Sequence, residues 1–316
     1  MSEELVPRQV VWRRQYREGR YARHLSRTEL NKRIRDVLLN LLHVTPDAMV
    51  GLRPVDEKSA VWMEKWTHVL EEMQLRYGPY PSGFDRDVLH SEAFPDFASD
   101  LAKQAAQRLS SLGLRDRDVF IKFGKREHME PLYESGILRV QPASFFAGRD
   151  HNGAIKDDEL ILPLSFVLSR DEVLRFVANP QDVPHNAPEQ RVDVHLHSPT
   201  DYWLYCGTSF VEPRLFVDFE ADACVIVRDK DSFRQMLLLA ASEALPGTTM
   251  REGPVTYVDP LLPHTTEIFV PLAKYFGYSY QEEYRFCWLP LQPIKKLVNV
   301  DVEIGGLQRI AELIVL

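Results

Sequence analysis

The sequence predicts an α+β protein, with a mainly helical N-terminal region over residues 1–115 and a sheet domain over residues 116–316. Apolar residues recur at helical spacing in the first part, whereas short β-branched and aromatic runs dominate the second. These runs do not alternate regularly with helices, which favours an antiparallel-rich sheet over repeated βαβ units. The 316 residues fit two domains of ordinary size, and 45% of them are apolar, enough for a sizeable core.

Three helices are expected in the N-terminal region. Ser26 and Glu29 have the spacing of a capping box, and the apolar positions that follow match one helix face until Pro46 interrupts it. A second helix is expected at 57–77 and a third at 97–112, which Gly113 ends. Two prolines and a glycine predict a loop at 77–81.

The second domain is expected to hold many short elements. The predicted strands are 119–123, 137–141, 161–168, 192–197, 202–206, 215–219, 223–227, 255–258 and 283–289. The predicted helices are 126–135, 170–178 and 231–244, and three prolines predict a loop at 179–190.

Cysteine usage and hydropathy indicate a cytoplasmic protein. Cys206, Cys224 and Cys287 form no CxxC pair, so neither a disulfide framework nor a zinc knuckle is expected, and a reducing compartment fits best. No run of 18 apolar residues is present, so no membrane contact is expected.

Charge is distributed unevenly along the chain. Residues 8–35 contain ten Lys or Arg and two acidic residues, a net charge of +8. Because the whole chain carries −8, the remainder carries −16. Trp12, Tyr16 and Tyr21 lie between these arginines, a pattern that would suit phosphates and stacked bases. The alternative is that this segment packs on the acidic remainder of its own chain or on an acidic partner.

Three separated segments carry the residues that suggest chemistry. The first is FIKFG at 120–124, with Lys122 at its centre and His128 shortly after it. The second is YCGTS at 205–209, a strand end with small hydroxyl residues. The third is KYFGYSYQEEYRF at 274–286, which contains Gln281 and Glu283.

This order of segments resembles the ADP-ribosyltransferase superfamily, in particular a bacterial toxin or phage-defence branch with a Gln-x-Glu motif. The resemblance covers roughly residues 118–290 and implies an ADP-ribosyltransferase-like split antiparallel β-sheet, with NAD as co-substrate. It implies that Glu283 stabilises the oxocarbenium-like ribose when nicotinamide leaves and hydrogen-bonds a ribose hydroxyl. Gln281 would orient the acceptor, and on an extended segment its side chain would face the same way as that of Glu283.

The resemblance also implies a set of NAD contacts. Lys122 would hold the pyrophosphate, hydroxyl residues would fix the ribose or position Glu283, and an aromatic ring such as Tyr284 could stack on nicotinamide. The expected NAD-binding residues are Lys122, Phe123, His128, Phe146, Tyr205, Thr208, Ser209 and Arg285. No metal is expected. The chain lacks the first-strand Arg or His-Gly-Thr of better-known branches.

Plainer interpretations stay open for these residues. Glu283 could pair with Arg285 as surface charge on a strand, and Lys122 could point to solvent. His128 could be a solvated helix residue, and Thr208 and Ser209 could be turn residues.

The function expected from the resemblance is mono-ADP-ribosylation of a macromolecule, plausible for a toxin or anti-phage effector with an antitoxin or other protein partner. Nucleic acid is favoured as the acceptor, because the Gln281 amide suits a base edge and the basic segment suits phosphates. In the superfamily, Gln-x-Glu members modify nucleobases or protein Asn and Gln.

Three other functions remain possible. With water as the acceptor, the chain would be an NAD glycohydrolase. His195 and His197, with Asp193 and Asp201 nearby, suggest a metal-dependent nuclease or nucleic-acid-binding protein. The last is a non-catalytic binding protein on a decayed transferase fold.

Overall fold

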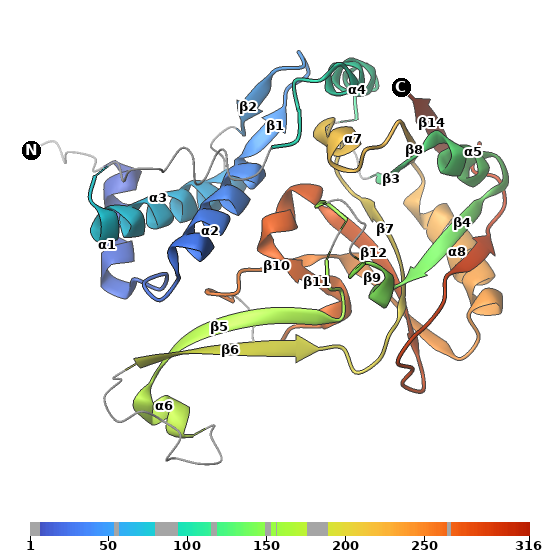
Figure 1. Cartoon of the computed structure of the whole chain (residues 1–316). Coiled ribbons are helices and arrows are strands. Elements are labelled where there is room, and N and C mark those ends of the chain that lie inside the picture. Colours follow the sequence, from blue (N-terminus) through green and yellow to red (C-terminus); the bar gives the residue numbers. More distant parts are fainter. Residues whose placement is uncertain are drawn as a thin grey trace, which may run out of the picture.

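The computed structural model describes residues 7–53, 57–79, 94–114, 119–148, 153–155, 157–175, 189–263 and 267–316. It confirms an α+β protein with an N-terminal helical region and antiparallel sheets. The first three helices lie on one side of the molecule and the large sheet on the other, whereas the fourth helix lies beside the sheet (Figure 1). None of the described helices is both long and apolar enough to cross a bilayer.

The N-terminal region contains helices and one short hairpin. Its elements are α1 Arg8–Gly19, α2 Arg27–Leu41, β1 Leu42–Val44, β2 Val50–Leu52, α3 Glu57–Tyr77 and α4 Asp100–Ser110. The capping box is present, because Ser26 Oγ accepts from the Glu29 N–H and Glu29 accepts from the Ser26 N–H. Helix α4 begins later than expected because Ser99 caps it at the Ala102 N–H. Of the predicted loop at 77–81, Tyr77 ends α3, residues 78 and 79 lie outside any helix or strand, and residues 80 and 81 lie outside the described residues.

The second region is built on one eight-stranded sheet. Its order is β13-β4-β7-β3-β8-β14, with β12 also on β7 and β9 on β12, and every pair is antiparallel. The strands are β3 Phe120–Gly124, β4 Ile137–Pro142, β7 Trp203–Thr208, β8 Ala223–Val227, β9 Thr248–Pro254, β12 Glu283–Pro290, β13 Val300–Glu303 and β14 Ala311–Val315.

The sheet divides at β7. One edge of β7 pairs with β12 along its whole length. The other edge is shared, because β4 pairs at Trp203 and Leu204 whereas β3 pairs at Thr208. Between these two contacts, in the described part of the chain, residues 205–207 pair only with β12. Gly207 permits this geometry, since a Cβ there would lie 2.4 Å from the Phe120 ring.

Helices cover both faces of the sheet. On one face, α5 Arg126–Ser135 and α8 Lys230–Ala244 pack on a core that includes Phe120 and Phe286. On the other, α4 and α7 Arg214–Asp218 pack on Ile121 and Cys224. Neighbouring residues of β3 thus enter opposite cores, as a strand buried on both faces requires.

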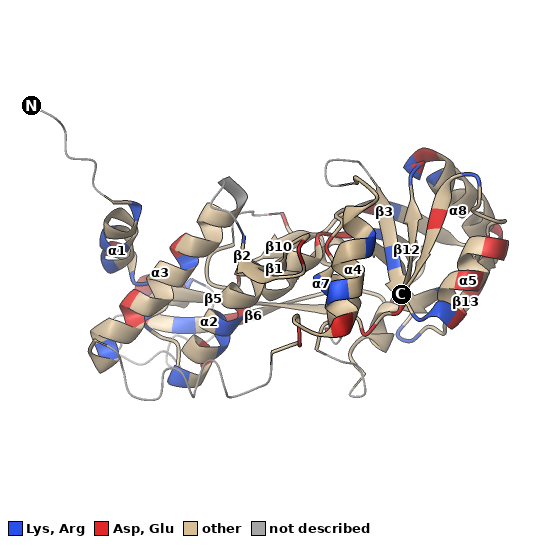
Figure 2. Cartoon of the chain, turned by 90° about the horizontal axis from the view of Figure 1, so that it is seen from above, with Lys and Arg blue, Asp and Glu red and all other residues tan. Residues whose placement is uncertain are grey.

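The remaining elements form smaller units. A long hairpin, β5 Ile161–Ser169 and β6 Glu189–His197, runs along the N-terminal helices (Figures 1 and 2), and Arg191 pairs with Glu29 of α2 at 2.6 Å. The others are α6 Arg170–Leu174, β10 Thr256–Val258 parallel to β11 Ala273–Tyr275, and the 3-10 helices η2 Ala143–Phe145, η4 Val270–Leu272 and η5 Phe276–Gln281. Of the predicted loop at 179–190, residues 189–190 belong to β6 and the rest lie outside the described residues, as do 176–178 of the predicted helix.

The strand expected at 215–219 is wrong, because these residues form α7. The Arg214 guanidinium pairs with Asp218 one helical turn later, at 2.8 Å. It also donates to the carbonyls of Leu39 and Leu42, where α2 ends. These long-range contacts favour a helix that the apolar run Leu215–Val217 does not predict.

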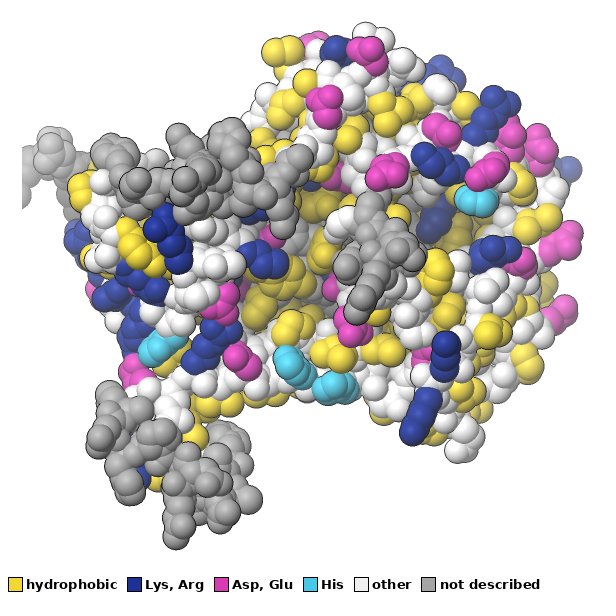
Figure 3. Space-filling model, in the orientation of Figure 1, with side chains coloured by type: hydrophobic (Ala, Val, Ile, Leu, Met, Phe, Trp, Pro, Cys, Tyr) yellow, Lys and Arg dark blue, Asp and Glu magenta, His cyan; other side chains and the backbone are white. Residues whose placement is uncertain are grey.

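The basic segment packs on acidic residues of its own chain. Tyr16 is buried and donates to Glu72 of α3, and Arg17 pairs with Glu71 at 2.6 Å. Arg20 also pairs with Glu72, at 3.0 Å. Lys and Arg side chains gather over these helices at the left of Figure 3. Much of the positive charge counted in the sequence is therefore matched within the molecule.

A buried ion cluster joins the N-terminal helices to the sheet region. Arg33 of α2 donates through both terminal nitrogens to Asp259, at 2.6 and 2.9 Å, and Lys65 of α3 donates at 2.5 Å. Burial alone would raise the pKa of Asp259, but the two cations hold it well below its usual range. Asn40 adds hydrogen bonds to the carbonyls of Phe276 and Gly277.

We predict that Arg33→Met lowers the free energy of unfolding by about 3–5 kcal/mol, because Asp259 loses its bidentate partner in a buried site. Urea unfolding would measure this. Lys32→Met is the control, because Lys32 lies on the same helix in an exposed pair with Asp36, and about 1 kcal/mol or less should be lost. Equal losses in both variants would contradict the structural importance of the cluster.

Candidate functional site

A cavity of about 610 Å³ lies where β3 and β4 separate along β7. Its size is typical of sites that hold small molecules or cofactors. Seven of the residues predicted from the sequence line it: Lys122, Phe123, Phe146, Tyr205, Thr208, Gln281 and Glu283. Segments more than 150 residues apart in the chain thus meet in one place, as the resemblance implied.

Four expected residues lie elsewhere. His128 is exposed on α5, which matches the plainer interpretation of a solvated helix residue. Ser209 Oγ donates to the Glu282 carbonyl at 3.3 Å, outside this cavity. Tyr284 packs against the core near Phe120. Arg285 is fully buried behind Glu283, so it can hold that carboxylate but does not line the cavity.

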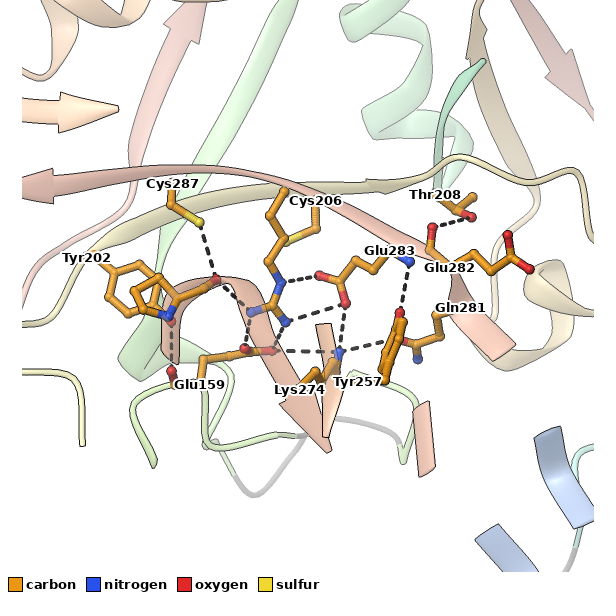
Figure 4. A network of polar contacts seen from close by, with 12 residues as sticks. Glu159, Tyr202, Cys206, Thr208, Tyr257, Lys274, Gln281, Glu282, Glu283 and Cys287 are labelled. Carbon is orange, nitrogen blue, oxygen red and sulfur yellow. Dashed lines mark hydrogen bonds and ion pairs between the residues drawn. The ribbon is translucent and has the colours of Figure 1, made fainter. Parts of the chain in front are cut away.

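Glu283 begins β12 inside a buried network of alternating charges (Figure 4). Lys274 Nζ donates to its Oε2 at 3.0 Å, and Arg285 Nε donates to its Oε1 at 2.8 Å. Both cations also contact Glu159, Arg285 at 2.7 Å and Lys274 at 3.7 Å. The Glu283 N–H donates to the Tyr257 hydroxyl at 2.9 Å, which fixes the start of the strand. Glu283 and Arg285 do pair, but in the interior rather than on a surface.

The network keeps Glu283 ionised. Burial by itself would raise the pKa of this carboxyl, but Arg285 and Lys274 hold it well below its usual range. Burial would likewise lower the pKa of Lys274, but Glu283 and Glu159 raise it above its usual value. Glu283 is therefore ionised, with one carboxylate oxygen held by Lys274 and the other by Arg285.

Gln281 and Glu283 converge, but not on an extended segment as expected. Gln281 ends the 3-10 helix η5, and Glu282 adopts a left-handed conformation with φ 41° and ψ 51° before β12 begins. Lys274 nevertheless bridges the two side chains, because its Nζ also donates to Gln281 Oε1 at 3.1 Å. The Gln281 amide nitrogen donates to the Ala154 carbonyl at 2.8 Å, so both ends of the amide are engaged within the chain.

Lys122 extends into the cavity from β3 rather than pointing to open solvent. Its Nζ donates to the Cys206 carbonyl at 2.6 Å and lies 4.8 Å from the centre of the Tyr205 ring. Burial lowers the pKa of this lysine. Lys125 and Arg139 also line the cavity. Lys125 donates to the Glu220 carbonyl, and Arg139 is paired with Asp301 at 2.7 Å.

Sequence reasoning missed Glu159, Lys274 and Tyr257. Lys274 opens the third motif segment, but no pattern assigns it a partner. Glu159 lies 126 residues before Arg285, the residue it pairs with. Only the folded arrangement of β10, β11 and β12 brings these residues together.

In the part of the chain that the structure describes, His195 and His197 are not joined by further metal ligands. His195 and His197 are exposed on β6, with ring centres 6.3 Å apart. Asp193 accepts from Ser165 and Arg191, and Asp201 is buried and accepts from Ser144. Within the described ranges, no group of three or more His, Cys, Asp or Glu residues could hold a metal ion.

Comparisons of the chain with protein-family models, with curated proteins and with solved structures found no match. The site is therefore defined by its chemistry: an ionised, buried carboxylate and several cations around one cavity in a divided antiparallel sheet.

Asp157 gives the site a pH-dependent stability. Burial, together with the carboxylates of Glu159 and Glu283, raises the pKa of Asp157 to about 6, although Lys274 and Arg285 act in the opposite direction. Because the folded pKa exceeds the ordinary value of 3.8, protonated Asp157 favours the fold at low pH, and this contribution is lost as pH rises through about 6.

We predict that Asp157→Asn stabilises the protein by about 1–3 kcal/mol near pH 7.5, whereas the gain disappears at about pH 4. Urea unfolding of both proteins across this range measures the difference. A gain that is independent of pH would show that the ionisation of Asp157 does not cause it.

Proposed function

We propose that this chain is an NAD-dependent ADP-ribosyltransferase with Glu283 as its catalytic carboxylate. The main observation in favour is that a buried carboxylate, held ionised by two cations, lines the same cavity as Lys122. The division of the sheet at β7 supports the split-sheet fold that the resemblance implies.

The proposed reaction needs a negative charge beside the ribose of NAD. The bond between C1′ of that ribose and the nicotinamide nitrogen breaks, and its electron pair leaves with nicotinamide. Positive charge develops on the ribose, and the Glu283 carboxylate opposes it. A lone pair of the acceptor then forms the new bond to C1′, and the acceptor loses a proton to solvent. Lys274 and Arg285 position the carboxylate, whereas Lys122, Lys125 and Arg139 suit the diphosphate.

The acceptor is proposed to be a nucleic acid, with a toxin or anti-phage role and a restraining protein partner as the biological setting. The sequence offered two reasons for a nucleic-acid acceptor, the Gln281 amide and the basic segment, and both are weaker in the folded chain. The Gln281 amide is engaged by Lys274 and Ala154, and many arginines of the basic segment pair with carboxylates. The support that remains is the resemblance.

Water is the second candidate acceptor, which would make the chain an NAD glycohydrolase. The specific observation is that Gln281, expected to orient a macromolecular acceptor, makes its hydrogen bonds inside the chain. Nicotinamide release without labelling of any macromolecule would favour this activity.

We predict that Glu283→Gln lowers the rate of nicotinamide release from NAD by about 100-fold or more, because the variant cannot oppose the developing charge. The release assay is run beside a NAD-binding measurement and a thermal melt. Glu312→Gln is the control, because Glu312 does not line the cavity and lies on β14 in a partly exposed pair with Arg228.

The variant could also lose the fold, since Lys274 and Arg285 lose a partner. Glu283→Asp is therefore measured beside Glu283→Gln, because aspartate keeps the carboxylate charge but its shorter side chain places that charge farther from the ribose. If a folded Glu283→Gln protein releases nicotinamide at the parental rate, the catalytic assignment is wrong.

We predict that Lys122→Met weakens NAD binding by about 10- to 100-fold, the value of one charge-assisted hydrogen bond, with a smaller effect on the rate once NAD is bound. Calorimetric titration and the dependence of rate on NAD concentration separate the two effects. Lys103→Met, on the exposed face of α4, is the control. Unchanged affinity would remove Lys122 from the diphosphate site.

A further inference from the structure

Lys122 and Lys274 both line the cavity where β3 and β4 separate, but their surroundings differ. Lys274 is only 5% exposed and pairs with Glu283 at 3.0 Å and with Glu159 at 3.7 Å. Lys122 is partly exposed, and it forms no ion pair in the part of the chain that the structure describes. Its Nζ donates to the Cys206 carbonyl instead. Carboxylates therefore hold one of these two amines and not the other.

The charge states of the two amines differ for the same reason. Burial lowers the pKa of Lys122, and the two titratable groups that act on it, Glu283 of β12 and Cys206 of β7, raise that pKa by less. Burial also disfavours the Lys274 ammonium, but Glu283 and Glu159 outweigh this effect and raise the pKa of Lys274. Of the two, Lys122 therefore becomes a neutral amine at the lower pH.

A neutral lysine amine in a cavity is a nucleophile, because its nitrogen carries a lone pair. The hydrogen bond from Lys122 to the Cys206 carbonyl uses an N–H and leaves that lone pair for a ligand. Lysines that form imines with carbonyl substrates are activated in this way, by desolvation in an apolar pocket. The partly exposed apolar side chains of the lining would contact the hydrocarbon part of such a ligand; they include Phe146, Ile155 and Phe219.

We propose that this cavity binds an aldehyde covalently, as an imine with the side chain of Lys122. The amine lone pair forms a bond to the carbonyl carbon, and the carbonyl oxygen receives a proton from the nitrogen through water. The resulting carbinolamine loses its hydroxyl group and a second nitrogen proton as one molecule of water, which leaves the imine. No oxidant or reductant is consumed. This reactivity goes beyond the proposed transfer from NAD, whose diphosphate would favour the ammonium form of Lys122, so the two ligands would exclude each other.

The test uses benzaldehyde, an uncharged aromatic aldehyde, together with cyanoborohydride, which reduces an imine to a stable secondary amine. The full chain is treated at about pH 7 and at about pH 10, near the ordinary pKa of lysine, and peptide mass spectrometry follows each modified lysine. NAD is left out, so the result does not depend on the transferase proposal.

Two lysines are internal controls. Lys274 shares the cavity but is held by carboxylates, and Lys103 lies in an exposed pair with Asp100 on α4. Lys122→Arg is treated beside the parent chain, because arginine can still donate to the Cys206 carbonyl but does not form the imine. A thermal melt checks that this variant is folded.

At about pH 7 we expect Lys122 to be modified about tenfold faster than Lys103, because more of it is neutral, while Lys274 stays unmodified. At about pH 10 the advantage of Lys122 should shrink, since Lys103 then loses its proton as well. The fast phase of benzaldehyde incorporation should be absent from folded Lys122→Arg. Modification of Lys122 no faster than that of Lys103 at the lower pH, equal modification of Lys122 and Lys274, or a fast phase that persists in the variant would each overturn the proposal.

Discussion

The contact between Lys274 and Glu283 is the interaction on which the arrangement of the site depends. Taking a carboxylate and an ammonium out of water is unfavourable unless each is closely paired, and the structure meets this condition by adding Arg285 and Glu159. The four side chains come from β11, β12 and the chain just before β5. The need to pair these four buried charges therefore determines how three separate segments meet at the edge of the cavity.

The same strands connect the site to the N-terminal helices. Strands β10 and β11 are parallel neighbours, with Tyr257 opposite Lys274 in the register. Asp259, the residue after β10, forms ion pairs with Arg33 of α2 and Lys65 of α3. Lys274 on β11 forms an ion pair with Glu283. The ion cluster at Asp259 and the ion cluster at Lys274 are therefore both built on the pair of strands β10 and β11. The helical region is thus tied to the framework of the site through Asp259.

The parts of the fold governed by local sequence were predictable, whereas those governed by distant contacts were not. Local rules sufficed for the Ser26 capping box and for the strand around Lys122. Helix α7 was missed because Arg214 is satisfied by carbonyls of α2, some 170 residues away in the chain. The convergence of Gln281 and Glu283 was expected from an extended segment, but it arises from a left-handed turn at Glu282 and from Lys274. Ion-pair partners such as Glu159 leave no periodic signal in a sequence.

The four-charge network also constrains how this sequence can evolve. Loss of any one member leaves one charge in excess in the interior, so a single substitution there is expected to be more damaging than the joint replacement of a carboxylate and a cation. Amino-acid substitutions at Glu159, Lys274, Glu283 and Arg285 are therefore expected to occur together, although the four residues are spread over 127 positions of the chain. Descendants of this protein would keep the four together or exchange them in pairs, which is a pattern of covariation rather than of simple identity.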